Sequence, residues 1–176
     1  MHIKLSMDEL KRPSVEAFKT QAKLPITLVL DNVRSMHNVG SAFRTADAFA
    51  IEQVILCGIT GTPPHREIEK TALGATQSVA WQHVTDTTMA IRQLRDAGYR
   101  VMAVEQAAGS YALHQFAPVT TEKYALVFGN EVHGVSDDVM AMVDNCIEIP
   151  QSGTKHSLNI AVSVGIVLWE FYAKLH

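Results

Sequence analysis

The sequence predicts a single α/β domain in which helices flank a mostly parallel sheet. The chain has 176 residues, of which 47% are hydrophobic and 19% charged, the balance of a folded globular domain. Short β-branched runs alternate with longer segments of helical spacing, which is typical of a parallel sheet. Polar clusters follow several of these runs, and parallel sheets bind their ligands beyond the carboxyl ends of the strands. We therefore expect a ligand site at that edge.

Six apolar runs predict the strands, and five segments with apolar residues at helical spacing predict the helices between them. The expected strands are 26–30, 53–57, 79–84, 100–104, 124–128 and 146–149. The expected helices are 41–50, 67–75, 86–98, 136–144 and 157–174. Residue types that cap helices support these limits. The expected caps are Asn38 or Ser41 for the first helix, Asp86 and Gly98 for the third, Ser136 for the fourth and Ser157 for the last.

Residues 1–23 differ in character and are expected to form a helical arm ahead of the domain at 24–176. The arm carries five Lys or Arg and three Asp or Glu, and Pro13 indicates a helix start. The whole chain contains 15 Lys and Arg and 18 Asp and Glu, which gives a formal net charge of −3. A protein that binds nucleic acid through bulk charge would be strongly basic. Any contact with nucleic acid must use a local patch or only a few phosphate contacts.

Several classes of protein are excluded by what the sequence lacks. Cys57 and Cys146 lie in apolar runs and are expected to be buried free thiols, too few for a disulfide framework. Neither a signal peptide nor an uncharged apolar stretch of 18 residues is present, so we expect a cytoplasmic protein outside the membrane. The eight His do not fall at ligand spacings, and no metal is expected. P-loop, dinucleotide-turn and nucleophile-elbow motifs are absent.

The last predicted helix is apolar on nearly its whole circumference. One face carries Leu158, Ala161, Val162, Gly165, Leu168, Trp169 and Tyr172, and another carries Ile160, Val164, Val167 and Phe171. A helix of this kind is buried on both sides. We expect its second side to meet a partner subunit in a homodimer, although burial within the chain's own domain is the alternative.

Three segments dense in polar residues and glycine follow predicted strands. They are 38–46 (NVGSAFRTA), 128–136 (FGNEVHGVS) and 149–159 (IPQSGTKHSLN). Each has an ordinary structural interpretation by itself, as a helix cap, a turn or a solvated loop. Arg44 is an exception, because in the second turn of helix 41–50 it opposes the helix dipole, which favours an external anion such as a phosphate. Their common place at strand ends predicts one shared site.

In this order the segments resemble the three motifs of the SpoU (TrmH) family of the SPOUT superfamily, which are RNA ribose 2′-O-methyltransferases. The matching patterns are N-x-G-x-x-x-R-T-A, G-N-E-x-x-G-[VL]-S and I-P-x-x-G-x-x-x-S-L-N, and the similarity covers about residues 24–173. The resemblance implies a deep trefoil knot over about 124–173. Knots are strongly disfavoured in general, so the residue pattern alone does not predict one.

The resemblance also implies a cofactor and a catalytic set. S-adenosylmethionine would bind in the knot, and members of the family pair as dimers through that region. The implied cofactor-binding residues are Gln106, Gly129, Asn130, Ile149, Pro150, Ser157 and Leu158. The implied catalytic residues are Arg44, with Asn38 as its support, and Glu131, Ser157 and Asn159 around the methyl donor. Arg stays protonated, so stabilisation of a developing alkoxide is a better role for Arg44 than that of a base.

The expected substrate is RNA, with tRNA favoured over rRNA. Many relatives carry an additional N-terminal RNA-binding domain, whereas only about 25 residues precede the matching region here. The expected RNA contacts are Arg34, His37, Arg66, Lys11 and Arg12. Two alternatives remain open. One is a non-catalytic RNA-binding or assembly module that keeps the fold, and the other is a hydrolase that pairs Ser157 with His156 or His133.

Overall fold

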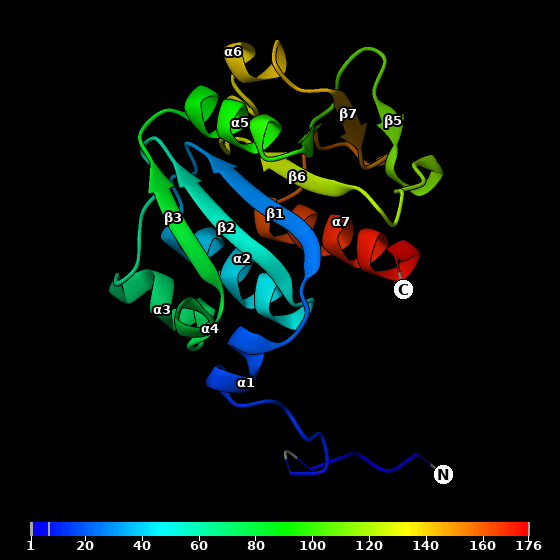
Figure 1. Ribbon diagram of the computed structural model, residues 1–176. Coiled ribbons are helices and arrows are strands. Elements are labelled where there is room, and N and C mark those ends of the chain that lie inside the picture. The colour runs from blue at the N-terminus through cyan, green and yellow to red at the C-terminus, as the bar shows by residue number, and fades with distance from the viewer. Residues whose placement is uncertain (1, 7, 176) are drawn as a thin grey trace.

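A sheet of parallel strands forms the centre of the molecule (Figure 1). The computed structural model describes residues 2–6 and 8–175. Along the sheet the order is β3-β2-β1-β6-β4-β7-β5, and each described pair of neighbours is parallel. The strands are β1 (Leu24–Asp31), β2 (Ile51–Cys57), β3 (Ala80–Val84), β4 (Tyr99–Val104), β5 (Tyr111–Ala112), β6 (Lys123–Phe128) and β7 (Asn145–Glu148). The predicted α/β class with a parallel sheet is confirmed.

Helices cover both faces of the sheet and give three layers (Figure 1). The helices are α1 (Val15–Thr20), α2 (Met36–Ala48), α3 (Arg66–Ala72), α4 (Ala75–Ser78), α5 (Thr87–Asp96), α6 (Asp137–Met140), α7 (Ile160–Leu175) and the 3-10 turn η1 (Leu113–Gln115). Buried residues of α2 and α7 share one core cluster with the sheet, and those of α5 and α6 share the other. None of the described helices has both the length and the apolar character needed to cross a membrane.

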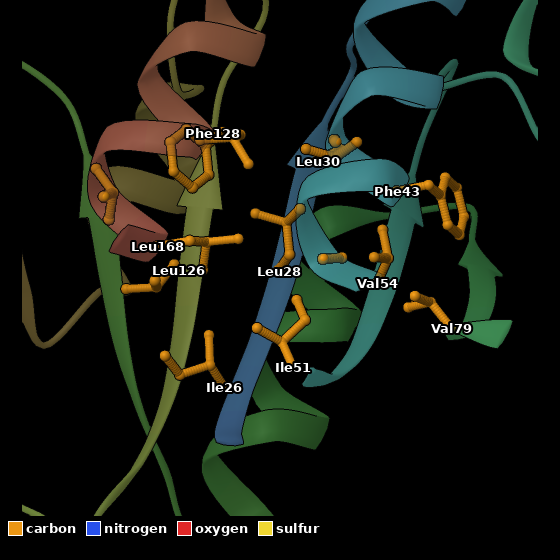
Figure 2. Packing of buried hydrophobic residues seen from close by; sticks show 14 of the residues in the cluster. Ile26, Leu28, Leu30, Phe43, Ile51, Val54, Val79, Leu126, Phe128 and Leu168 are labelled. Carbon is orange, nitrogen blue, oxygen red and sulfur yellow. The ribbon is translucent and has the colours of Figure 1, made fainter. Parts of the chain in front are cut away.

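Alternating residues of β1 explain why its run is apolar throughout. Leu28 and Leu30 belong to the cluster beneath α2 and α7, whereas Val29 between them belongs to the cluster beneath α5. A strand that is buried on both faces needs apolar side chains at successive positions. Figure 2 shows the first cluster, in which Leu126 and Phe128 of β6 lie beside Leu168 of α7.

The first long helix begins earlier than expected, at Met36 rather than at residue 41. Its N-cap is Ser35, whose side chain accepts a hydrogen bond from the backbone N–H of Asn38, so neither Asn38 nor Ser41 is the cap. Gly40, which disfavours helix by its flexibility, lies inside this helix. A Cβ there would come within 2.2 Å of the backbone oxygen of Ile68, so glycine permits the close contact between α2 and α3.

The last two helices are also shorter than predicted, α6 at its end and α7 at its start. α7 begins at Ile160, and Ser157 does not cap it. Asn159 caps the helix instead, because its side-chain oxygen accepts a hydrogen bond from the N–H of Ala161 at 2.8 Å. The helix predicted over 136–144 ends at Met140, where the chain turns into β7. α4, β5 and η1 were not predicted because elements of two to four residues hold too little periodicity.

The N-terminal segment lies at the starting ends of β1, β2 and β3 (Figure 1). Its helix, α1, has six residues, begins after the N-cap Ser14 and buries Phe18 in the core. The described residues before Ser14 contain only a turn. Both cysteines are free thiols; Cys57 is buried and Cys146 is half-buried.

Candidate active site

A pocket of about 560 Å³ opens beyond the carboxyl ends of β4, β6 and β7. Strand β6 lies between β1 and β4, so the pocket adjoins the place where the chain changes direction along the sheet, a usual position for ligands in such folds. Its lining comes from three stretches of chain that follow these strands. They are Val104–Gln106, Phe128–Gly134, and the segment after β7 that contributes Ile149, Gln151, His156–Ile160 and Ser163.

The second polar segment forms a tight loop along the pocket. The N–H of Asn130 donates to the oxygen of Gly134 at 2.8 Å, and the N–H of Gly134 donates back at 2.9 Å. A Cβ at Gly129 would lie 2.0 Å from the carbonyl carbon of Gly134, so the close approach requires glycine. Gly134 has a φ of +69°, which also favours glycine. The spacing of these two glycines is therefore a steric requirement of the loop.

Glu131 fastens this loop to the start of α2. Its carboxylate accepts hydrogen bonds from the backbone N–H groups of Arg34 and Ser35, both at 3.0 Å, and from the side-chain amide of Asn38 at 3.1 Å. Partial burial raises the pKa of Glu131, but the hydrogen bonds from Arg34, Ser35 and Asn38 outweigh it and hold the pKa below its usual value. Glu131 therefore acts as an anchored anion at a helix N-terminus, where the helix dipole also favours it.

A second amide contact extends this connection to α7. The side-chain oxygen of Asn38 accepts a hydrogen bond from the side-chain amide of Asn159 at 3.2 Å. Since Asn159 also caps α7, one chain of contacts runs from Glu131 through Asn38 to the start of the last helix. The three polar segments that the sequence singled out thus meet in one hydrogen-bonded group.

The segment after β4 supplies another part of the pocket lining. The side-chain amide of Gln106 donates to the backbone oxygen of His156 at 2.9 Å and so joins this part of the lining to the third segment. The carboxylate of Glu105 accepts from the N–H of Gln106 at 2.8 Å and from the N–H of Val135 at 3.1 Å. Glu105 was not among the predicted site residues, although it lies directly after a predicted strand.

Six of the seven predicted cofactor residues line the pocket, namely Gln106, Gly129, Asn130, Ile149, Ser157 and Leu158. Pro150 does not line it, although its neighbours Ile149 and Gln151 do. Ser157 is exposed and reaches the pocket because α7 starts three residues later than expected. Among the described residues, no group of three or more His, Cys, Asp or Glu lies together in a way that could hold a metal ion.

Arg44 lies apart from the hydrogen-bonded group. It is exposed, is the ninth residue of α2 and is not among the pocket residues. It therefore belongs to the third turn, and the argument from an opposing helix dipole does not hold, because that effect fades beyond the first turn. Asn38 and Arg44 point about 120° apart around the helix axis. Within the described part of the chain, its guanidinium makes no hydrogen bond or ion pair.

The residues predicted to contact RNA fall into two places. All three of Arg34, just before α2, His37, in its first turn, and Arg66, at the start of α3, are exposed, and the His37 ring lies 2.8 Å from the Glu67 carboxylate. Lys11 and Arg12 lie in the N-terminal segment, at the opposite end of the sheet from the pocket (Figure 1). Of the five, only Arg34 contacts a described site residue, through its backbone N–H to Glu131.

Comparison with known proteins matches residues 25–169 to the SpoU rRNA Methylase family. The chain belongs to this family. It is 32% identical over 83% of its length to the 23S rRNA (guanosine-2′-O-)-methyltransferase RlmB of Neisseria meningitidis serogroup B. It is 30% identical over 92% of its length to a putative TrmH family tRNA/rRNA methyltransferase of Staphylococcus haemolyticus. The chain spans 57% and 64% of these two relatives, about three fifths of their length.

Two solved structures share the fold. The AdoMet-bound rRNA methyltransferase from Sinorhizobium meliloti superposes with a TM-score of 0.80 at 29% identity, covering 92% of this chain and 60% of that one. A second solved structure, reported under the words "Structural insights into the 2-OH methylation of C/U34 on tRNA", superposes with a TM-score of 0.75 at 27% identity. The match covers 85% of this chain and 95% of that one. The resemblance drawn from the three motifs is thereby confirmed at the level of the family.

Proposed function

We propose that this SpoU family chain transfers a methyl group from S-adenosylmethionine to a ribose 2′-hydroxyl of RNA. The observation that carries the proposal is the meeting of the three motif segments beside one pocket, through the contacts of Glu131, Asn38 and Asn159. A relative named as a 23S rRNA (guanosine-2′-O-)-methyltransferase and an rRNA methyltransferase structure with bound AdoMet support the same reaction. The domain would comprise residues 24–176, with 1–23 as an arm.

The pocket fits the cofactor in size and chemistry. Its volume of about 560 Å³ lies within the usual range for small-molecule sites. Val104, Ile149 and Leu158 offer apolar surface to an adenine ring. Glu105 and Glu131 are the charged carboxylates of the lining, which holds no Lys or Arg among its described residues, and this suits a cation. When bound, the cofactor supplies a methyl group on a positively charged sulfur and leaves as a neutral thioether.

The chain's own task is to position the hydroxyl and to stabilise its loss of a proton. The 2′-oxygen must lie in line with the methyl group, which places the ribose at the mouth of the pocket. We assign Arg44 to the developing alkoxide or to the adjacent phosphate, because its exposed guanidinium is not engaged by another described residue. Asn38, Glu131, Ser157 and Asn159 shape the wall between α2 and the pocket.

Two further features of the family belong to this proposal. We propose a trefoil knot over about residues 124–173, which contains the loop after β6 and the segment leading to α7. We also propose a homodimer through α7, because Val162 and Trp169 on this helix are 50% and 56% exposed.

The substrate is proposed to be RNA, with tRNA ahead of rRNA. The names of relatives support both, since RlmB acts on 23S rRNA and the structure covered to 95% concerns C/U34 of tRNA. Calorimetric titration with S-adenosylmethionine tests the first part of the proposal. Binding followed by transfer of labelled methyl to bulk tRNA or rRNA supports an enzyme. RNA binding without cofactor binding supports the non-catalytic module.

A further inference from the structure

A buried carboxylate that the proposed reaction does not use lies behind the pocket loop. Asp31, the last residue of β1, is 1% exposed. Its Oδ1 accepts hydrogen bonds from the Thr87 hydroxyl at 2.6 Å and from the Asn32 side-chain amide at 2.9 Å. Its Oδ2 accepts from the N–H of Ser136 at 3.1 Å and from the Ser136 hydroxyl at 3.0 Å. Four donors thus converge on one anion, which forms no ion pair with a described cation.

The pattern of donors explains why this residue is an acid. A buried charge is costly unless hydrogen bonds satisfy it. Here hydrogen-bond donors approach both side-chain oxygens. Only a carboxylate offers an acceptor at both positions, because an amide has one oxygen and one NH₂ group. An amide at position 31 would direct an NH₂ group either at Ser136 or at Thr87 and Asn32. The geometry therefore requires aspartate specifically, and an isosteric asparagine cannot reproduce it.

Ser136 gives up a local hydrogen bond to make this contact. It stands at the N-cap position of α6, where a serine hydroxyl usually accepts a backbone N–H, yet its side chain makes no capping bond. The hydroxyl donates to Asp31 instead. Ser136 directly follows Gly129–Val135, of which the residues up to Gly134 line the pocket. The contact with Asp31 therefore fixes the end of the pocket loop.

The start of the same loop is held by the neighbouring residue. The side-chain amide of Asn130 donates to the backbone oxygen of Asn32 at 2.7 Å. Asn32 has a φ of +55°, and its side-chain oxygen accepts from the N–H of Ile59, so its own position is fixed too. The adjacent residues Asp31 and Asn32, at the end of β1, therefore form hydrogen bonds with both ends of the loop.

We propose that Asp31 is a positioning residue, which fixes the loop 129–136 in the shape that binds S-adenosylmethionine. The inference rests on the proposed function for the identity of the ligand. Asp31 acts through Ser136 and touches neither cofactor nor RNA. Its removal should therefore weaken cofactor binding while leaving the chemical step unchanged once cofactor is saturating.

The test compares three variants of the full chain by calorimetric titration with S-adenosylmethionine, well below their melting temperatures. D31N disrupts the contact with Ser136, and S136A removes the hydroxyl hydrogen bond to Asp31 while the backbone N–H contact stays. S136A keeps the test decisive should D31N fail to fold. T87V is the matched control, because it removes a donor to the same carboxylate from α5, outside the loop. We expect Kd to rise at least fivefold in D31N and S136A and less than twofold in T87V.

Hydrogen exchange of the peptide spanning 129–136 supplies a readout that needs no ligand. This peptide should exchange faster in D31N and S136A than in wild type. In T87V its exchange rate should equal that of wild type. Unchanged exchange together with wild-type affinity in D31N and S136A would overturn the inference and leave Asp31 a structural residue. If wild type itself binds no S-adenosylmethionine, the proposed function fails, whereas the exchange experiment still decides whether Asp31 positions the loop.

Discussion

At the scale of single residues, the site is organised by two carboxylates that accept several hydrogen bonds each. Glu131 accepts from the backbone N–H groups of Arg34 and Ser35 ahead of α2, and Asp31 accepts from the N–H and the hydroxyl of Ser136 at the end of the loop. The sequence predicted Glu131 as part of the site through its motif. It did not predict Asp31, whose partners Thr87 and Ser136 lie 56 and 105 positions away. Hydrogen bonds of that separation leave no local pattern in a sequence.

Glu131 gives a prediction about pH. Its pKa is lowered in the folded protein, so it contributes stability that is present above its ordinary value of 4.5 and is lost as the pH falls through the lowered value. We expect E131Q to lower the free energy of unfolding by about 1 kcal/mol at pH 7, since the group is partly solvated.

Denaturant unfolding at pH 7 and pH 3.5 measures the effect. The difference between wild type and E131Q should shrink as the pH falls below about 4.5, because protonation removes the advantage of the carboxylate. A difference that stays constant over this range would mean that the carboxylate does not anchor α2.

At the scale of elements, periodicity predicted the long helices and buried strands, but their limits followed side-chain contacts. α2 starts five residues early because Ser35 caps it, and α7 starts late because Asn159 does. Both shifts concern the site, since they move Asn38 into a helix and leave Ser157 in a loop. Several serine and asparagine residues stand near each start, so the sequence alone does not select the cap.

Gly40 provides a prediction for the contact between α2 and α3. G40A should lower the free energy of unfolding by about 1–3 kcal/mol, because its methyl group would overlap the backbone oxygen of Ile68, although alanine favours helix in itself. S41A in the same turn is the control and should change stability by less than about 0.5 kcal/mol. Thermal unfolding compares them, and a G40A protein as stable as wild type would show that the helices can separate without cost.

At the scale of the whole molecule, the parallel sheet and the gathering of three motifs at one edge followed from the sequence, whereas the strand order did not. β6 inserts between β1 and β4, a placement set by long-range pairing. The nearly all-apolar α7 was predicted to be buried on both sides. In the single chain it buries Val164, Val167, Leu168 and Phe171 and leaves Val162, Ile166 and Trp169 exposed.

That exposed face gives the prediction about assembly. A row of large apolar side chains on one helix is unfavourable in water and typical of a subunit interface. We expect a dimer by light scattering at micromolar concentration and a monomer for V162E. Q93E, at an exposed position on α5, should remain dimeric. A wild-type monomer would contradict the proposed homodimer.

The most direct test of the central claim is the product of the reaction itself. Purified protein would be incubated with labelled S-adenosylmethionine and either bulk tRNA or rRNA, and the RNA digested to nucleosides for mass spectrometry. We predict a 2′-O-methylated nucleoside from wild type and a loss of at least 100-fold in rate for R44A, with cofactor affinity retained. Label on a base, no transfer to either RNA, or full activity of R44A would contradict the account.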